Sequence, residues 1–185
     1  QKILDVTITW KIEAAGKIDA DIAVTKDDEF PDLPRFGVRM FLDKKLSAVR
    51  YFGMGPQESY CDKHQAASHG LYQANVDDLH EDYIRPQENG SHYDCEYVEL
   101  NNSRYGIVVS AENAFSFNAS YYTQEELEEK THNYELTESD SVVFCVDYAL
   151  NGIGSNSCGP VVLEQYRFDD VLFRFQFTLI PYIKG

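Results

Sequence analysis

The dominant pattern along the chain is an alternation of apolar and polar residues, which indicates strands with one buried face. The alternation is clearest over Val171–Leu179, where every odd position is apolar and positions 174, 176 and 178 are Arg, Gln and Thr. Three of the odd positions are phenylalanines, which we expect to face the core. The same reasoning predicts seven further strands, over Ile3–Ile12, Lys17–Thr25, Arg35–Leu42, Ala48–Phe52, His92–Leu100, Gly106–Ala111 and Val142–Tyr148.

Turn-forming residues separate these strands, as at Ala15-Gly16, Asn101-Asn102-Ser103 and Asn151-Gly152. Parallel α/β folds would need helices between the strands, and the pattern does not provide them. About ten short strands at this spacing favour an antiparallel sandwich or barrel. The sequence therefore predicts an all-β fold.

One short helix is predicted after Thr123. The run Thr123-Gln124-Glu125-Glu126 is a capping box, in which the Thr123 hydroxyl accepts from the Glu126 N–H and the Glu126 side chain reaches back. Leu127 gives the helix one anchor to the core, and we expect it to end near Thr131-His132.

Composition and charge narrow the possible partners. The 185 residues fit one domain, and 43% of them are hydrophobic. The net charge of −15 repels phosphate backbones and anionic lipids, so we expect neither nucleic-acid nor membrane binding. This charge neither favours nor opposes the binding of a neutral ligand such as a sugar. The opening QKILDVTITW reads like the inside of a strand, as expected of a domain from a longer polypeptide.

The four cysteines match no paired zinc or redox motif. Their even number allows two disulfides, but the composition is not that of a small disulfide scaffold, and we expect free thiols. The cysteines are Cys61, Cys95, Cys145 and Cys158.

Three loops have unusual sequences. Pro56-Gln57-Glu58 and Pro86-Gln87-Glu88 share three letters, but their flanks differ, so they are two separate loops. Gln87, Glu88 and Asn89 either lock their own turn or form the polar rim of a sugar-facing groove. The third loop, residues 151–160, is rich in glycine. Its backbone is either held close to another group or forms a long hairpin connection.

No catalytic or metal-binding motif stands out. Glycoside cleavage needs two carboxyl groups about 5–9 Å apart, and Glu58, Glu88 and Glu164 are the loop or strand-end candidates. Such residues are more often solvated surface carboxylates than catalytic groups. The five histidines show no metal-ligand spacing, although a histidine and a glutamate together could catalyse sugar ring opening.

Five motifs, in this order, resemble the C-terminal, small-chain domain of bacterial β-galactosidases of glycoside hydrolase family 2. The resemblance extends from Pro34 to the end of the chain. The motifs are GMGPQESYCDK (Gly53–Lys63), YIRPQENGSHYD (Tyr83–Asp94), ASYYTQEELEEKTHNYEL (Ala119–Leu136), DYALNGIGSNSCGP (Asp147–Pro160) and YRFDDVLFRFQFTLIP (Tyr166–Pro181).

The resemblance implies an antiparallel β-sandwich of the galactose-mutarotase-like supersandwich type with one short helix. Residues 1–185 would form a single domain, the C-terminal portion of the small-chain domain. The family's catalytic glutamates lie on a separate (β/α)₈ barrel, which needs about 250 residues, so no catalytic residue is expected here. Many relatives have a tryptophan near the active-site mouth where this loop has Cys158. We expect Asn156, Ser157 and Cys158 to line the composite site.

The resemblance also implies partners. These are the remaining domains of a β-galactosidase, a β-galactoside bound through the parent active site, and further copies of the parent in a homo-oligomer. We expect no cofactor in this chain, whereas the parent would use a divalent cation and sodium. The parent would be bacterial, either cytoplasmic or periplasmic. The alternative is an autonomous mutarotase-like module that binds carbohydrate or epimerises aldoses, with a His–Glu pair in a cleft.

Overall fold

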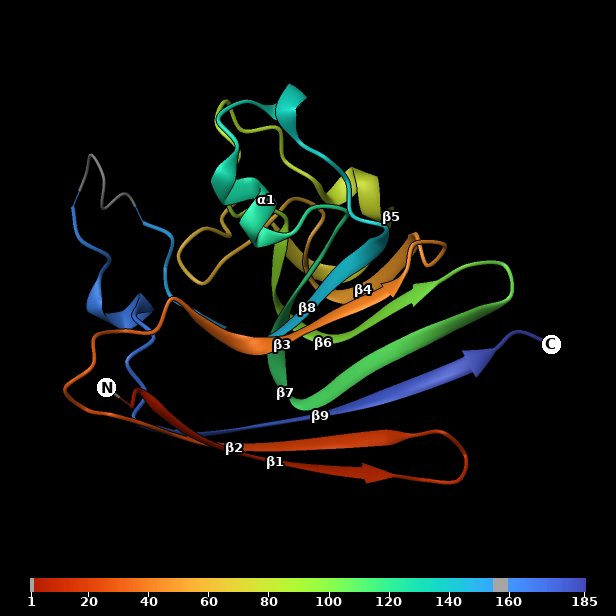
Figure 1. The fold of residues 1–185 in the computed structure, drawn as a ribbon, viewed down its shortest axis with the longest axis horizontal. Helices are drawn as coiled ribbons and strands as arrows, with labels where there is room; N and C mark the ends of the chain where they lie inside the picture. Colours follow the sequence, from red (N-terminus) through yellow and green to blue (C-terminus); the bar gives the residue numbers. More distant parts are fainter. Residues whose placement is uncertain (1, 155–159) are drawn as a thin grey trace.

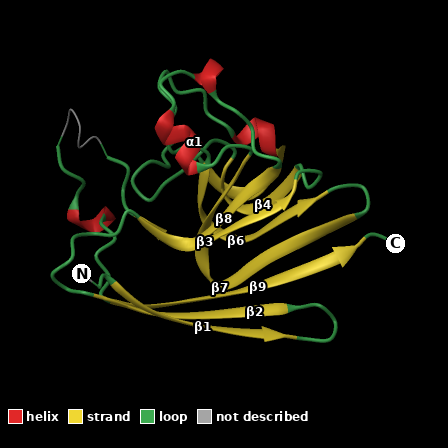
Figure 2. Cartoon of the chain, viewed as in Figure 1, coloured by secondary structure: helices red, strands yellow, loops and turns green. Residues whose placement is uncertain are grey.

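The computed structural model describes residues 2–154 and 160–185, and their strands form one continuous, branched antiparallel sheet (Figures 1 and 2). The elements are β1 (Leu4–Ile12), β2 (Ile18–Lys26), β3 (Arg35–Asp43), β4 (Ala48–Gly55), β5 (Ser68–Asn75), η1 (Val76–Leu79), β6 (Ser91–Asn101), β7 (Tyr105–Ser120), α1 (Gln124–Glu129), η2 (Asn133–Glu135), β8 (Ser141–Leu150), η3 (Glu164–Tyr166) and β9 (Leu172–Ile183).

The long strand β7 joins two layers. Its first half, residues 105–110, pairs with β9, and its second half, residues 116–120, pairs with β8. The sheet therefore splits along β7, with β1, β2 and β9 on one side and β3 and β8 on the other (Figure 1). The two layers pack against each other, because the Phe173 ring of β9 lies 5.0 Å from Phe36 of β3 and stacks at 4.7 Å on Tyr148 of β8. This arrangement confirms the all-β sandwich prediction.

All eight predicted strands are present, and the main errors concern a missed strand and a strand end. β5 was not predicted, because its sequence SHGLYQAN is mostly polar and it forms a sheet edge beside β4. β7 does not end at Ala111 but continues to Ser120. The polar residues Glu112 and Asn113 hide this continuation in the sequence.

The helix has the predicted N-cap but a different partner for its glutamate. The Thr123 hydroxyl accepts from the Glu126 N–H at 3.1 Å. The Glu126 carboxylate does not reach back, because it accepts from the Thr137 N–H at 2.8 Å. Helix α1 ends at Glu129 rather than near Thr131. The second half of the predicted capping box is therefore wrong.

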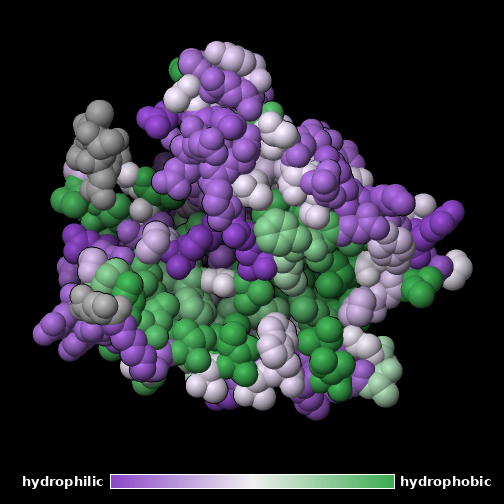
Figure 3. All heavy atoms as spheres, viewed as in Figure 1, coloured by the Kyte–Doolittle hydropathy of each residue, from purple (hydrophilic) through white to green (hydrophobic). Residues whose placement is uncertain are grey.

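One apolar face of the sheet continues past the core. The core-facing residues of β2 and β9 are buried, as with Ile22 at 1% exposure and Phe175 at 4%. The register places Ile8 of edge strand β1 beside Ile22. Nevertheless, the apolar residues of β1 stay open to solvent, with Ile8 48% and Trp10 47% exposed. A broad band of apolar atoms lies over the region between β3 and β2 (Figure 3).

Candidate functional site

The two PQE loops meet at a buried carboxylate. The Glu58 side chain, 5% exposed, accepts from the Lys63 ammonium and the Tyr83 hydroxyl through Oε1, and from the Gly90 N–H at 2.8 Å through Oε2. Lys63 also donates to the Tyr83 hydroxyl at 2.7 Å. Burial opposes ionisation of Glu58, but these three donors outweigh it and hold the pKa of the carboxyl below its ordinary value. Glu58 thus joins both loops.

The root of the glycine-rich loop lies against the same region. Asp62 accepts from the Ile153 N–H at 3.1 Å and from the Gly154 N–H at 2.8 Å. A side chain at position 152 would meet Val162 at 2.8 Å. The backbone is therefore held close to its neighbours here, as one of the two interpretations predicted. A polar hollow lined by Gln57, Asp62, Lys63, His64 and Tyr83 lies over this junction.

The polar groups of the RPQENG turn bond both within the turn and to neighbouring segments. Asn89, 5% exposed, accepts from the Glu81 N–H at 3.0 Å and donates to the Gln87 carbonyl at 2.9 Å. The Gln87 side chain is exposed, and Glu88 accepts from Arg35 at 3.2 Å. These contacts support the self-locked turn. A sugar contact by Gln87, Glu88 or Asn89 stays a prediction. Asn156, Ser157 and Cys158 lie outside the described residues.

Arg35 holds a second buried charge pair below this turn. It donates to Asp147 from both Nε and Nη2, at 3.2 and 2.5 Å, and the Asp147 side chain is 2% exposed. Burial opposes the charge on Arg35, but the Asp147 carboxylate outweighs it and raises the pKa of the guanidinium. Burial raises the pKa of Glu88 above its ordinary value. Arg35 and Asp147 were missed because each is a single charged residue within a predicted strand, and neither strand pattern indicates which residue it would pair with.

The predicted carboxylates and histidines lie in several different surroundings. Glu58 and Glu88 each face a basic partner, and Glu164 is exposed on η3. His92 is a core residue, 1% exposed and stacked at 5.0 Å on Phe117, and burial lowers its pKa to about 4. Among the described residues, the one histidine ring nitrogen within 4.0 Å of a glutamate oxygen is on the surface, where His132 Nδ1 lies 3.6 Å from Glu135 Oε2.

The structure also bears on the predictions about metals, membranes and disulfides. Residues 2–154 and 160–185 contain no group of three or more His, Cys, Asp or Glu that could hold a metal ion, and the metal-free expectation stays a prediction. None of the described helices is long and apolar enough to cross a membrane. Cys61, Cys95 and Cys145 are free thiols, as predicted, and Cys158 is outside the described residues.

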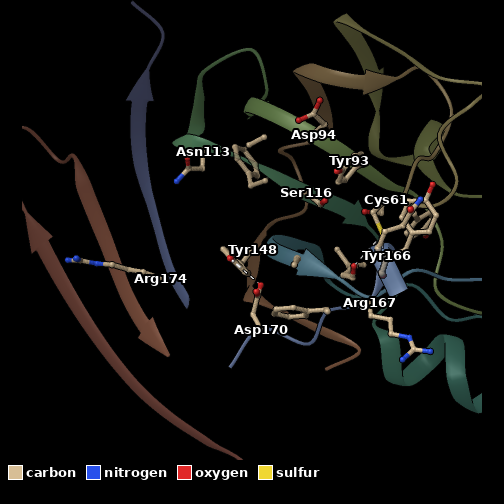
Figure 4. A pocket seen from close by; sticks show the side chains of 18 residues that line it. Cys61, Tyr93, Asp94, Asn113, Ser116, Tyr148, Tyr166, Arg167, Asp170 and Arg174 are labelled. Carbon is tan, nitrogen blue, oxygen red and sulfur yellow. Dashed lines mark hydrogen bonds between the residues drawn. The ribbon is translucent and has the colours of Figure 1, made fainter. Parts of the chain in front are cut away.

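A separate cavity of about 440 Å³ lies between the layers (Figure 4). Tyr93 and Asp94 of β6, Ser116 of β7 and Tyr148 of β8 line it. Tyr166, at the end of η3, closes it on the side of Cys61. Sequence reasoning missed this cavity, because its walls come from strands distant in sequence.

Comparison with known proteins identifies the family. The sequence profile described as β-galactosidase small chain matches residues 1–179. The chain is 50% identical over 97% of its length to a β-galactosidase of Actinobacillus pleuropneumoniae, and 38% identical over 96% to one of Staphylococcus xylosus. It spans only 17% and 18% of those two relatives. Together with the loop motifs and the sandwich, these matches show that the chain belongs to the β-galactosidase small chain family.

Proposed function

We propose that this chain is a non-catalytic domain of a β-galactosidase whose other domains hydrolyse terminal β-D-galactosides. In this proposal the chain supplies structural contacts and a loop at the rim of the active site. The relatives are several times longer, which leaves room for a catalytic barrel elsewhere in the polypeptide.

The observation that carries the proposal is the exposed apolar face of β1. Val6, Ile8, Trp10 and Ile12 alternate with polar residues, as in a strand whose one face is meant to be buried. All four are between 43% and 71% exposed. Contiguous apolar surface of this kind marks contact with another protein surface. The remaining polypeptide of the parent is the occupant that we propose for it.

The rim contribution rests on the glycine-rich loop. Asp62 fixes the described root of this loop, at Ile153 and Gly154, beside the Glu58 junction. In the proposal, Asn156, Ser157 and Cys158 then line the parent active site. The parent's divalent cation, its sodium and its homo-oligomeric state belong to the same proposal. The cation would be bound mainly by other domains, because the described residues offer no cluster of ligands.

A chimaera tests the proposal. The matching segment of the Actinobacillus pleuropneumoniae relative is replaced by this chain, and hydrolysis of a chromogenic β-galactoside is measured. We expect the chimaera to be active, and both the relative lacking the segment and the isolated chain to be inactive. Loss of chimaera activity on chelation, or on replacing sodium by potassium, checks the proposed ions. Hydrolysis by the isolated chain would refute the proposal.

A matched pair of variants tests the β1 face. Ile8→Lys places a charge on the apolar face, whereas Thr9→Lys places it on the opposite face of the same strand. We expect Ile8→Lys to lower the yield of assembled, active chimaera and Thr9→Lys to leave it unchanged. Equal behaviour of the two variants, measured by size-exclusion chromatography and activity, would contradict the role given to this face.

A further inference from the structure

Two branches of the sheet leave the same edge of β7, and they differ in length. The first half of β7 pairs with β9, and β2 and β1 follow β9. The second half pairs with β8, and β3 follows β8. Both halves have β6 on their opposite edge. Within the described residues, one branch therefore has three strands beyond β7 and the other has two.

The exposed apolar residues lie where the shorter branch ends. β3 covers β9, because the Phe36 ring packs on Phe173. Trp10 of β1 points to the same face as Phe173, since its ring lies 6.3 Å from Phe177 of β9. Nevertheless, Trp10 is 47% exposed, and no strand of the described residues covers β1. Figure 3 shows the band of apolar atoms that is left open between β3 and β2.

The inner face of β3 is incompletely enclosed as well. Its core-facing residues Phe36, Val38, Met40 and Leu42 pack against the core, but each of them is only half-buried. On β8, the next strand inward, residues 142–147 are all buried. In a sandwich, the inner faces of the two layers bury each other, so the last strand of a layer stays partly open. One more strand beside β3 would enclose this face.

The backbone of β3 independently indicates a missing neighbour. Over the part of the chain that the structure describes, β3 pairs with β8 alone, so its other edge is free. The Asn151 N–H donates to the Pro34 carbonyl at 3.0 Å, which directs residue 34 toward β8. Successive residues direct their polar groups to opposite edges of a strand, and the extra residue at the register shift belongs to β8. The N–H groups of Gly37, Arg39 and Phe41 therefore point to the free edge.

A free edge next to an uncovered apolar face fits one kind of partner, which is another strand. An unpaired edge is a template for strand addition, with main-chain hydrogen bonds along the edge and side-chain contacts from alternate residues. A strand added to β3 would lie about 4.8 Å beyond it. It would extend the shorter branch to three strands. Its inward-facing side chains would then cover Ile8 and Trp10, which β3 leaves exposed.

From these observations we propose that a strand of the parent polypeptide pairs with the free edge of β3 and covers the apolar face of β1. The added strand runs antiparallel to β3, as in the other strand pairs of the sheet. Its apolar residues alternate with polar ones and face Ile8 and Trp10. The inference rests on the proposed function, because the chain spans only 17% and 18% of its two relatives and the rest of the parent supplies the strand. A second copy of this chain is the competing occupant.

Hydrogen exchange followed by mass spectrometry tests the proposal. It is measured on the isolated chain and on the chimaera with the Actinobacillus pleuropneumoniae relative, with fragmentation of the peptide that covers residues 35–43. In the isolated chain we expect Gly37, Arg39 and Phe41 to exchange quickly, whereas Val38 and Met40 exchange slowly because they bond to β8. In the chimaera the three outward amides should slow by about a hundredfold or more, because they enter the sheet.

Two variants at one position separate backbone pairing from side-chain contact. Phe41→Pro removes an outward N–H, and proline is tolerated on an edge strand where the N–H faces solvent. Phe41→Val removes the ring but keeps the N–H. In the chimaera, Phe41→Pro should speed the exchange of Gly37 and Arg39 about tenfold, as expected for the loss of one net backbone hydrogen bond. Phe41→Val should have a much smaller effect. Urea unfolding of both isolated variants checks that the pairing with β8 is kept.

Each of four outcomes would overturn the proposal. Fast exchange of the outward β3 amides in an active chimaera would refute it and leave the proposed function standing. An inactive, unassembled chimaera would refute the proposed function and this inference with it. Slow exchange of the same amides in a dimer of the isolated chain would assign the edge to a second copy. Equal effects of Phe41→Pro and Phe41→Val would show that the contact is made by the ring and not by the backbone.

Discussion

Replacing Glu58 by alanine should destabilise the chain strongly, because a single buried carboxylate holds two loops together. The Glu58 carboxylate is 5% exposed and joins the two PQE loops through Lys63, Tyr83 and the Gly90 N–H. Its removal breaks all three bonds at once. It also leaves the buried N–H of Gly90 without an acceptor.

The expected cost follows from these contacts. Hydrogen bonds to charged groups contribute about 1.5–3 kcal/mol each, and breaking a buried ion pair costs about 3–5 kcal/mol. The Lys63 side chain is 48% exposed and is solvated once Glu58 is removed, so losing this ion pair costs less than the full value for a buried pair. We therefore expect a loss of about 3 kcal/mol for Glu58→Ala. Glu58→Gln keeps the shape and one acceptor, and should lose about 1 kcal/mol.

Urea unfolding followed by circular dichroism measures these losses as shifts of the midpoint. Glu129→Ala, at a 74% exposed side chain on α1, is the control and should leave the midpoint unchanged. If Glu58→Ala moved the midpoint no further than Glu129→Ala, the hydrogen bonds at Glu58 would not stabilise the fold and the reasoning would be refuted.

The same residue predicts a pH dependence. The pKa of Glu58 lies below its ordinary value of 4.5 in the folded chain, so the folded state holds the ionised form more strongly than the unfolded state. Its stabilising contribution is therefore present above about pH 4.5 and is lost as the pH falls through the folded-state pKa. Urea midpoints measured below pH 5 should fall more steeply for the native sequence than for Glu58→Gln.

Three further predictions concern buried residues. The pKa of His92 is about 4 in the folded chain, against an ordinary 6.5. The free energy of unfolding should therefore fall as the pH drops from about 6.5 towards 4. His92→Phe should make this fall with pH smaller in urea titrations. Gly90→Ala should cost about 2 kcal/mol or more, because φ is +72° and a Cβ would lie 2.4 Å from the Leu79 carbonyl oxygen. Gly16→Ala, with φ of +90° but only an ordinary contact of its Cβ with Pro181 at 3.8 Å, should cost about 1 kcal/mol. Equal thermal shifts for the two variants would contradict this account. Burial raises the pKa of the Cys145 thiol to about 11, so this thiol should react with a thiol reagent only after unfolding. Fast reaction in the native chain would show that Cys145 is not buried.

The sequence by itself determined the fold class and most of the strands. The alternation in Val171–Leu179 identifies β9 because a strand turns successive side chains to opposite faces, a property of the backbone alone. The Thr123 cap could also be predicted from local sequence, because the N–H that it bonds lies only three residues away. The order of the loop motifs indicated the family that the comparisons later showed.

Only the tertiary structure decided which polar residues come together. Glu58 meets Gly90, and Arg35 meets Asp147, across long stretches of chain. No periodicity encodes such pairs, because they depend on how β7 divides the sheet into two layers. The cavity between the layers arises in the same way. Local patterns fix local geometry, whereas sites between strands distant in sequence exist only once the sheet has folded over on itself.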